Sequence, residues 1–298
     1  MNEIIPKQIT FIDLCCGIGS FHYAMNIEIN NSKCVLASDI HVPAKKSYKE
    51  NYNLEVDDNL INIDYKNIDA DILFSGNPCQ SFSQIGNHKG FNDERGDLFN
   101  FILDNIVKLN KYKIIVFENV YGLATHDKGN TLKYITNKIN SYNYGVFVKI
   151  LLCSDYGIPQ NRKRLFIICL SKNTFKENID YYINIFDNIL KENFNKNITL
   201  SEYLHKNFIK KVAYTIRCGG SNSPIKSKQN WDGYYVKDEN DNLSEYRLTI
   251  EDMKILQGFP NDFTLIGTQT EQKKLLGNTI PTNLTRLICK FISSLLVR

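Results

Sequence analysis

The sequence predicts an α/β fold in which helices cover both faces of a mostly parallel sheet. Short apolar runs alternate with amphipathic stretches through the first 170 residues, which is typical of strand–helix–strand units. The chain has 298 residues, 43% hydrophobic and 23% charged, enough for one large domain with a smaller one. We expect domains at residues 1–180 and 181–274, then a terminal helix (275–298) that returns to the first domain.

The expected elements follow from the spacing of apolar residues. Buried apolar runs predict strands at residues 9–15, 33–39, 71–76, 112–120, 144–153 and 164–170. Helical spacing predicts helices over residues 20–27, 41–52, 97–109, 130–141 and 275–297. From residue 171 to 246 the periodicity weakens, and a loop is expected at 219–233. The second domain is therefore predicted to be small and irregular.

Composition and cysteine spacing restrict the class of protein. A net charge of +4 permits a polyanionic partner without requiring one. The first residues lack the pattern of a secretory signal, and no run approaches the ~18 apolar residues of a membrane span. Several of the eight cysteines lie in apolar runs, and none forms a CxxC pair, which favours reduced thiols over disulfides or a zinc site. We expect a cytoplasmic protein without a metal.

A glycine turn follows the first expected strand. The residues CCGIGSF (15–21) end that strand and open a helix, and glycines there allow a ligand to approach the backbone closely. Asp39 ends the second strand about twenty residues later, where a carboxylate accepts ribose hydroxyls. A purely structural turn with a solvated aspartate is the alternative. The combination favours a cofactor that contains a nucleoside.

Cys79 lies in GNPCQSFSQIG (76–86), directly after an apolar strand. A free cysteine beside a strand is more often an inert core residue than a reactive one. Here Pro78 fixes the turn, and the thiol is expected at the carboxyl end of a central strand, where ligands bind in open α/β sheets. A polar, glycine-containing loop follows and is suited to act as a lid. This context favours a nucleophile, although Asn77-Pro78 also partly matches enzymes that methylate exocyclic amino groups.

Three further charged residues lie near strand ends. Glu118 in FENV is either a hydrogen-bonded strand terminus or a partly desolvated carboxyl whose raised pKa lets it share a proton with a ring nitrogen. Arg162 and Arg164 belong to IPQNRKRLF, a basic run that is usually a solvated surface. Alternate residues of an extended segment face the same way, so both guanidinium groups are expected to point into one cleft.

Seven segments occur in the order found in DNA cytosine-5 methyltransferases, which the chain resembles. They are FIDLCCGIGSF, ASDI, GNPCQSFS, FENV, IPQNRKRLF, LQGFP and GNTIP. The resemblance covers residues ~9–170 and ~247–290, while residues ~171–245 carry no match. It implies a Rossmann-like S-adenosylmethionine-dependent methyltransferase fold with a small target-recognition domain, and S-adenosyl-L-homocysteine as the cofactor product.

The resemblance also implies a set of cofactor contacts. The pocket would be formed by residues of the glycine turn, with ribose, adenine and wall contacts from other segments: Asp13, Gly17, Ile18, Gly19 and Phe21, then Asp39, Asp58, Asn59, Pro78, Leu98, Asn278 and Ile280. Ile40 stands where many relatives have an aromatic ring, and it is still expected to pack against the adenine.

The implied reaction is addition of Cys79 to C6 of a cytosine flipped out of duplex DNA, with Glu118 at N3 and Arg162 and Arg164 positioning the base. The expected DNA contacts are Gln80, Ser83, Lys89, Arg95 and Arg217. Double-stranded DNA is the expected partner of a monomer, and a restriction endonuclease acting on the same site is a further candidate.

Three alternatives differ from this interpretation. A transfer-RNA cytosine-5 methyltransferase is built on the same fold, and the recognition region of this chain is short. A non-catalytic subunit with a cofactor fold would not need the four residues Cys79, Glu118, Arg162 and Arg164 together. An amino-group methyltransferase would need an aromatic residue where Gln80 stands. The intact IPQNRKR segment favours DNA.

Overall fold

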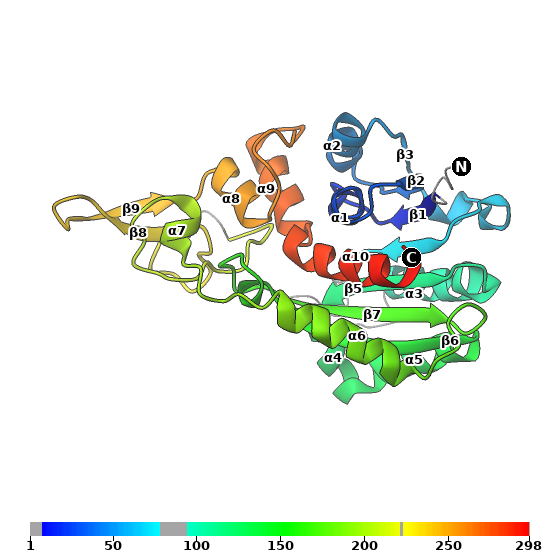
Figure 1. Cartoon of the computed structure of the whole chain (residues 1–298). Coiled ribbons are helices and arrows are strands. Elements are labelled where there is room, and N and C mark those ends of the chain that lie inside the picture. Colours follow the sequence, from blue (N-terminus) through cyan, green and yellow to red (C-terminus); the bar gives the residue numbers. More distant parts are fainter. Residues whose placement is uncertain (1–7, 78–93, 221–222, 298) are drawn as a thin grey trace, which may run out of the picture.

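One mixed sheet forms the centre of the protein. The structure, a computed structural model, describes residues 8–77, 94–220 and 223–297, without the side chains of residues 94–97. Within these residues a seven-stranded sheet has the order β3-β2-β1-β4-β5-β7-β6 (Figure 1). Its strands are β1 (Ile9–Leu14), β2 (Ser32–Ser38), β3 (Val56–Asp57), β4 (Ile72–Ser75), β5 (Ile114–Val120), β6 (Tyr144–Leu152) and β7 (Lys163–Ser171).

The pairing of the strands confirms the predicted, mostly parallel sheet. β1 pairs in parallel with β2 and β4, β4 with β5, and β2 with β3. β7 is antiparallel to both β5 and β6. The six predicted strands are present within one or two residues of their expected bounds, whereas β3 has only two residues and offers no periodic signal.

Helices cover both faces of the sheet, as predicted. Successive residues of β5 point to opposite layers, with Ile114 and Val116 in one core and Ile115 and Phe117 in the other. The first core includes residues of α1 (Ser20–Glu28), α2 (Val42–Tyr52), α6 (Ile179–Glu192) and α10 (Thr282–Leu296). The second includes residues of α3 (Glu94–Asn105), α4 (Gly122–Thr125) and α5 (Asn130–Ser141). This is a three-layer arrangement in which the loops at the carboxyl ends of the strands remain free for a site.

The single helix predicted over residues 275–297 is wrong, because the segment forms two helices. α9 (Gln269–Asn278) begins at a capping box of Thr268 and Glu271, and α10 starts after Pro281. Proline lacks an amide hydrogen and disfavours a helical conformation in the residue before it, so the chain is extended at the break. Thr279, two residues before Pro281, is also extended, with φ −70° and ψ 151°.

The region after residue 171 is more regular than its sequence indicated. α6 packs against β6 and α10, so this helix belongs to the sheet layers and crosses the boundary predicted at residue 180. Beyond it lies a smaller lobe with α7 (Leu200–Leu204), the antiparallel hairpin of β8 (Gly233–Lys237) and β9 (Leu243–Arg247), and α8 (Ile250–Leu256). The hairpin projects at the end of the molecule away from the sheet (Figure 1).

Trp231 forms part of the core of the smaller lobe. Its side chain is fully buried, and its indole nitrogen donates a hydrogen bond of 2.7 Å to the carbonyl of Gly219. Trp231 therefore attaches the loop that precedes β8 to the core of this lobe.

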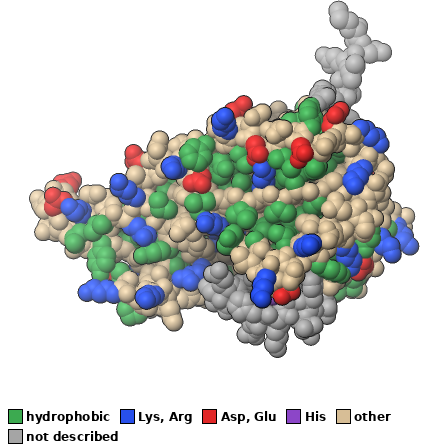
Figure 2. Space-filling view, turned by 90° about the horizontal axis from the view of Figure 1, so that it is seen from below, with side chains coloured by type: hydrophobic (Ala, Val, Ile, Leu, Met, Phe, Trp, Pro, Cys, Tyr) green, Lys and Arg blue, Asp and Glu red, His purple; other side chains and the backbone are tan. Residues whose placement is uncertain are grey.

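The surface carries charges of both signs. On the face drawn in Figure 2, lysine and arginine side chains are spread over both lobes and do not form one compact patch. None of the helices in the described part of the chain is long and apolar enough to cross a membrane.

Candidate active site

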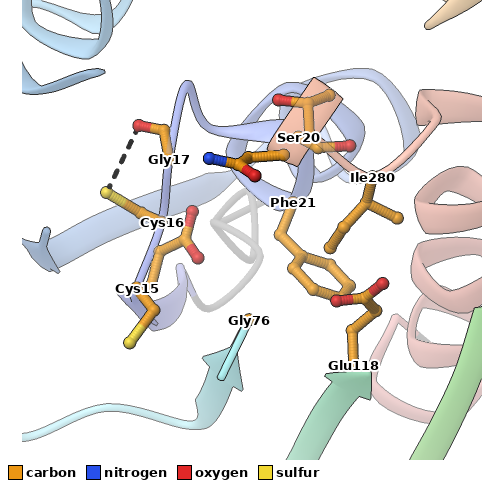
Figure 3. Close-up of a pocket in the computed structure, with 11 residues that line it drawn as sticks. Cys15, Cys16, Gly17, Ser20, Phe21, Gly76, Glu118 and Ile280 are labelled. Atoms are coloured by element: carbon orange, nitrogen blue, oxygen red, sulfur yellow. Dashed lines mark hydrogen bonds between the residues drawn. The ribbon is translucent and has the colours of Figure 1, made fainter. Parts of the chain in front are cut away.

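A pocket opens at the carboxyl ends of the central parallel strands (Figure 3). It contains about 370 Å³ of empty volume, part of it open to solvent. The described residues that line it come from the ends of β1, β4 and β5, from the start of α1 and from the break between α9 and α10: Asp13, Cys15, Cys16, Gly17, Ser20, Phe21, Gly76, Glu118, Asn278, Thr279 and Ile280. This position agrees with the general location of ligands in open α/β sheets.

The two glycines of the turn after β1 have different functions. Gly17 has a φ of +55°, and a Cβ atom built there would meet no atom within 4 Å, so its backbone faces open space. Gly19 has a φ of +84°, and its Cβ would lie 2.4 Å from the Tyr52 ring and 2.8 Å from the Tyr48 ring. Only glycine allows both the left-handed turn and this packing. Gly17 therefore keeps space open in the pocket, whereas Gly19 allows the start of α1 to pack closely against α2.

The two hydrophobic residues predicted in the same turn also differ in position, one at the pocket and one in the core. Phe21 lines the pocket and stacks on Phe74 of β4 with ring centroids 4.3 Å apart. Ile18 is fully buried in the core. Ile18 and Gly19 are thus not among the described lining residues, although both were predicted to line the cofactor pocket.

Asp13 is a buried carboxyl with one oxygen free to accept a hydrogen bond. Oδ2 of Asp13 is buried and has no hydrogen-bond partner among the described residues. Burial, and then the negative charge of Asp39, raise the pKa of Asp13, while a hydrogen bond with Tyr48 opposes them. Tyr48 also lies 2.8 Å from Nδ1 of the buried His22. An orphaned oxygen at the pocket wall indicates a ligand that brings a donor or a positive charge.

Asp39 holds the glycine turn from the end of β2. Its two carboxylate oxygens accept the backbone N–H groups of Gly17 and His41, both at 2.8 Å. A carboxylate oxygen has a second lone pair, so these bonds leave room for ribose hydroxyls. The predicted ribose contact remains a prediction.

The other predicted adenine and wall contacts have local partners. Asp58 pairs with Lys45, Asn59 accepts the N–H of Ile61 at 3.0 Å, and Leu98 packs against the second core. Ile40 is 81% exposed. The side chain is therefore accessible to a ligand, and the expectation that Ile40 packs against the adenine stays a prediction.

Glu118 faces the pocket from the end of β5, toward the Phe21 ring and Ile280 (Figure 3). Its Oε1 lies 2.7 Å from Nε of Arg164, and both side chains are largely buried. Burial raises the pKa of Glu118, and the charges of Arg164 and Arg162 oppose that rise. The result is a carboxyl that is more readily protonated than an exposed one, within reach of a ligand.

Arg162 does not point into this space. Its side chain is 1% exposed, and its Nη atoms donate hydrogen bonds to the carbonyls of Ile216, Gly277 and Thr279 at 2.6, 2.9 and 2.6 Å. Burial lowers the pKa of Arg162 to about 9, so the group stays charged at neutral pH. The prediction that both guanidinium groups face one cleft is wrong: Arg162 precedes β7, where the chain is not yet paired in the sheet, and only Arg164 reaches Glu118.

Several predicted site residues lie outside the described residues: Pro78, Cys79, Gln80, Ser83 and Lys89. Arg95 is in the first turn of α3, and its side chain is not described. Asn77 is buried and accepts a hydrogen bond from Ser75. Arg217 is partly buried and donates a bond of 3.2 Å to the carbonyl of Gln229.

Five lining residues were not predicted: Cys15, Cys16, Ser20, Gly76 and Thr279. Four of them lie beside predicted positions in the glycine turn and the GNPC segment, so their place in these two segments could have indicated them. Thr279 belongs to a helix break that was not expected. Across the described ranges no group of His, Cys, Asp or Glu side chains has the arrangement of a metal site.

Comparison with known proteins gives one family. The model of the C-5 cytosine-specific DNA methylase family matches residues 9–294. The Type II methyltransferase M.SsoII of Shigella sonnei is 32% identical over 306 aligned residues, which cover 96% of this chain and 80% of the relative. M.HhaI of Haemophilus parahaemolyticus is 39% identical over 185 residues, covering 61% and 56%.

Solved structures agree with the fold. The Dnmt2 methyltransferase of S. pombe has a TM-score of 0.70 at 21% identity and covers 97% of this chain and 99% of its own. The Entamoeba histolytica methyltransferase EhMeth has a TM-score of 0.69 at 22% identity, with coverage of 97% and 98%. At such identities the likeness concerns the fold alone.

Proposed function

The chain belongs to the C-5 cytosine-specific DNA methylase family and is a DNA (cytosine-5-)-methyltransferase, and we propose that it acts through Cys79, Glu118 and Arg164 on a cytosine turned out of duplex DNA. One observation carries this proposal: a buried Glu118 paired with Arg164 faces the same pocket as the glycine turn. We assign the glycine turn to the side of the pocket that binds the cofactor, and Glu118 with Arg164 to the side where the base reacts.

The pocket suits S-adenosyl-L-methionine, the cofactor that the family and fold imply. When bound, this cofactor supplies an electrophilic methyl group on a positively charged sulfur. Asp13 presents an unpaired carboxylate oxygen, which complements a cationic ligand, and Gly17 leaves its backbone accessible. Phe21, Asn278 and Ile280 would form walls, with Asp39 at the ribose. The finer contacts of Asp58, Asn59, Pro78 and Leu98, and the absence of a metal requirement, are part of the same proposal.

Cys79 is the proposed nucleophile. Cys79 follows Gly76, which lines the pocket, by three residues in the sequence. The thiolate adds to C6 of cytosine while Glu118 gives its proton to N3, which makes C5 nucleophilic enough to accept the methyl group. The C5 proton then leaves to solvent, Cys79 departs as the thiolate to restore the ring, and the N3 proton returns to Glu118.

Arg164 has two functions in this scheme. At 2.7 Å from Glu118 it fixes the direction of the carboxyl, and it opposes the rise in the pKa of Glu118 that burial causes. General acid catalysis requires an acidic group that is held close to the atom it protonates and has a pKa near the working pH.

The smaller lobe is the proposed DNA-reading part. Residues 205–231 contain six lysines and arginines and no acidic residue, whereas the hairpin turn that follows carries Asp238, Glu239 and Asp241. Positive side chains of this kind neutralise phosphates and give binding that weakens with salt. Arg217 belongs to this stretch. Gln80, Ser83, Lys89 and Arg95 are proposed as further DNA contacts. We further propose a monomer that shares its site with a restriction endonuclease, as suits the Type II relatives.

Bisulfite sequencing of DNA from a host that expresses the protein tests the function. We expect protection of cytosine at one short sequence motif in duplex DNA, and no protection in a host without the gene. Purified protein should transfer labelled methyl groups to duplex DNA and not to transfer RNA. N4-methylcytosine or N6-methyladenine as the product, or methylation of transfer RNA alone, would contradict the proposal.

Gly17→Ala is expected to weaken cofactor binding more than it weakens the fold. The new Cβ points into the pocket and the residue must keep a φ of +55°, so we expect about a tenfold loss of affinity for S-adenosyl-L-homocysteine by calorimetry. Gly129→Ala is the matched control. Gly129 has a φ of +88° outside the pocket, so the same backbone strain should lower the melting temperature without changing the affinity. Equal losses of affinity in both variants would contradict a cofactor role for Gly17.

A further inference from the structure

The carboxyl end of α9 is capped by a residue from elsewhere in the chain. The last carbonyl groups of a helix lack partners within the helix. Here the carbonyls of Gly277 and Thr279 accept hydrogen bonds from Nη2 of Arg162, at 2.9 and 2.6 Å. A cation also suits the partial negative charge at this end of a helix. Arg162 therefore satisfies one carbonyl in the last turn of α9 and one just beyond it.

The same guanidinium holds the smaller lobe. Its Nη1 donates to the carbonyl of Ile216, at 2.6 Å, and Ile216 in turn donates its N–H to Oε1 of Gln160 at 3.3 Å. Gln160 also donates to the carbonyl of Leu256 at the end of α8, at 2.7 Å. Arg162 and Gln160 are both buried. The segment before β7 thus joins the sheet, the smaller lobe and the terminal helices.

The cofactor pocket depends on this junction. Asn278, Thr279 and Ile280 line the pocket, and Arg162 holds the carbonyls on both sides of Asn278. The side chain of Asn278 also accepts a hydrogen bond of 2.9 Å from the thiol of Cys218 in the smaller lobe. Arg162 itself is not among the described lining residues: its two Nη atoms are engaged by these bonds, and its Nε is buried without a partner among the described residues.

We propose that Arg162 is a positioning residue that fixes the cofactor wall at residues 278–280 against the smaller lobe. The proposal rests on the proposed cofactor function of the pocket. It separates the two arginines of the IPQNRKR segment: Arg164 acts at Glu118, and Arg162 acts through the backbone of the wall. Cofactor binding should therefore depend on Arg162 even when no DNA is present.

Binding of S-adenosyl-L-homocysteine to the full chain without DNA tests this separation. Arg162→Met removes both hydrogen bonds to the wall, and Arg162→Lys lacks the forked guanidinium that makes them, so we expect the dissociation constant to rise about tenfold or more. Arg164→Lys is the matched control, with an expected change within about twofold, because Arg164 does not hold the wall. Hydrogen exchange should also become faster at residues 276–282 in Arg162→Lys, and stay unchanged in Arg164→Lys.

Cys218→Ala supplies a second test that does not put the fold at risk. It removes the thiol's hydrogen bond to Asn278 and its longer one, of 3.6 Å, to the carbonyl of Lys274 in α9, at an exposed position, and we expect a loss of affinity of about threefold with an unchanged melting temperature. Unchanged affinity in the Arg162 variants, or in Cys218→Ala if the Arg162 variants do not fold, would overturn the proposal. Absence of binding by the natural protein would instead remove the cofactor proposal on which it rests.

Discussion

Replacing Cys79 by serine is expected to abolish methyl transfer to duplex DNA. A cysteine thiol with a pKa of about 8.5 is partly ionised near neutral pH, whereas a serine hydroxyl is not, and the thiolate is the species that adds to C6. We expect the rate of transfer from labelled S-adenosyl-L-methionine to fall by at least roughly three orders of magnitude. Binding of DNA and of S-adenosyl-L-homocysteine should remain, because the change is a single atom.

A second cysteine provides the control for this experiment. Cys169 lies on β7, fully buried in the layer with α3 and α5 and away from the pocket. Cys169→Ala should keep its activity within about twofold and lose about 1 kcal/mol of stability. DNA that contains 5-fluorocytosine should trap a covalent complex with the natural protein and not with Cys79→Ser. Robust methylation by Cys79→Ser would remove Cys79 as the nucleophile.

The elements with strong local patterns could be predicted from the sequence. The strands that form the centre of the sheet are continuous apolar runs, and α5 has the spacing of an amphipathic helix, so periodicity alone found them. The glycine turn and Glu118 were found because parallel strands bring their carboxyl ends to one edge. These inferences needed only local sequence and the geometry of a parallel sheet.

The remaining features depend on contacts between distant segments. The alternation of side chains in an extended segment predicted that Arg162 and Arg164 point the same way. The Arg162 guanidinium instead donates hydrogen bonds to carbonyls that are 54 to 117 residues away in sequence, which the local pattern does not reveal. The break between α9 and α10 lies just before Pro281, but its place in the pocket depends on tertiary contacts, because α9 packs against α2 and α8 whereas α10 packs against α1 and α6. β8 and β9 form a hairpin with a mostly exposed strand, which leaves little hydrophobic alternation to detect.

Glu118→Gln is expected to reduce the rate of methyl transfer by about 10²- to 10⁴-fold, the usual contribution of a general acid. Glutamine preserves the size of the side chain and accepts a hydrogen bond from Arg164, but it has no proton to give to N3. Because burial raises the pKa of Glu118 against the charges of Arg164 and Arg162, the natural carboxyl holds the proton that the amide cannot supply. The loss should appear in kcat, measured in single-turnover reactions with saturating DNA and cofactor.

Glu28→Gln is the matched control for Glu118→Gln, because Glu28 forms the same kind of pair outside the pocket. Its Oε1 lies 2.6 Å from Nε of Arg286, and its side chain is about as buried as that of Glu118. The loss of an ion pair is therefore common to both variants, and only the proton at the pocket differs. We expect Glu28→Gln to keep its rate within about twofold. If both variants lose activity equally, the effect is structural and Glu118 is not the acid; if only Glu118→Gln does, with cofactor affinity unchanged, the proton from Glu118 is required for the addition of Cys79.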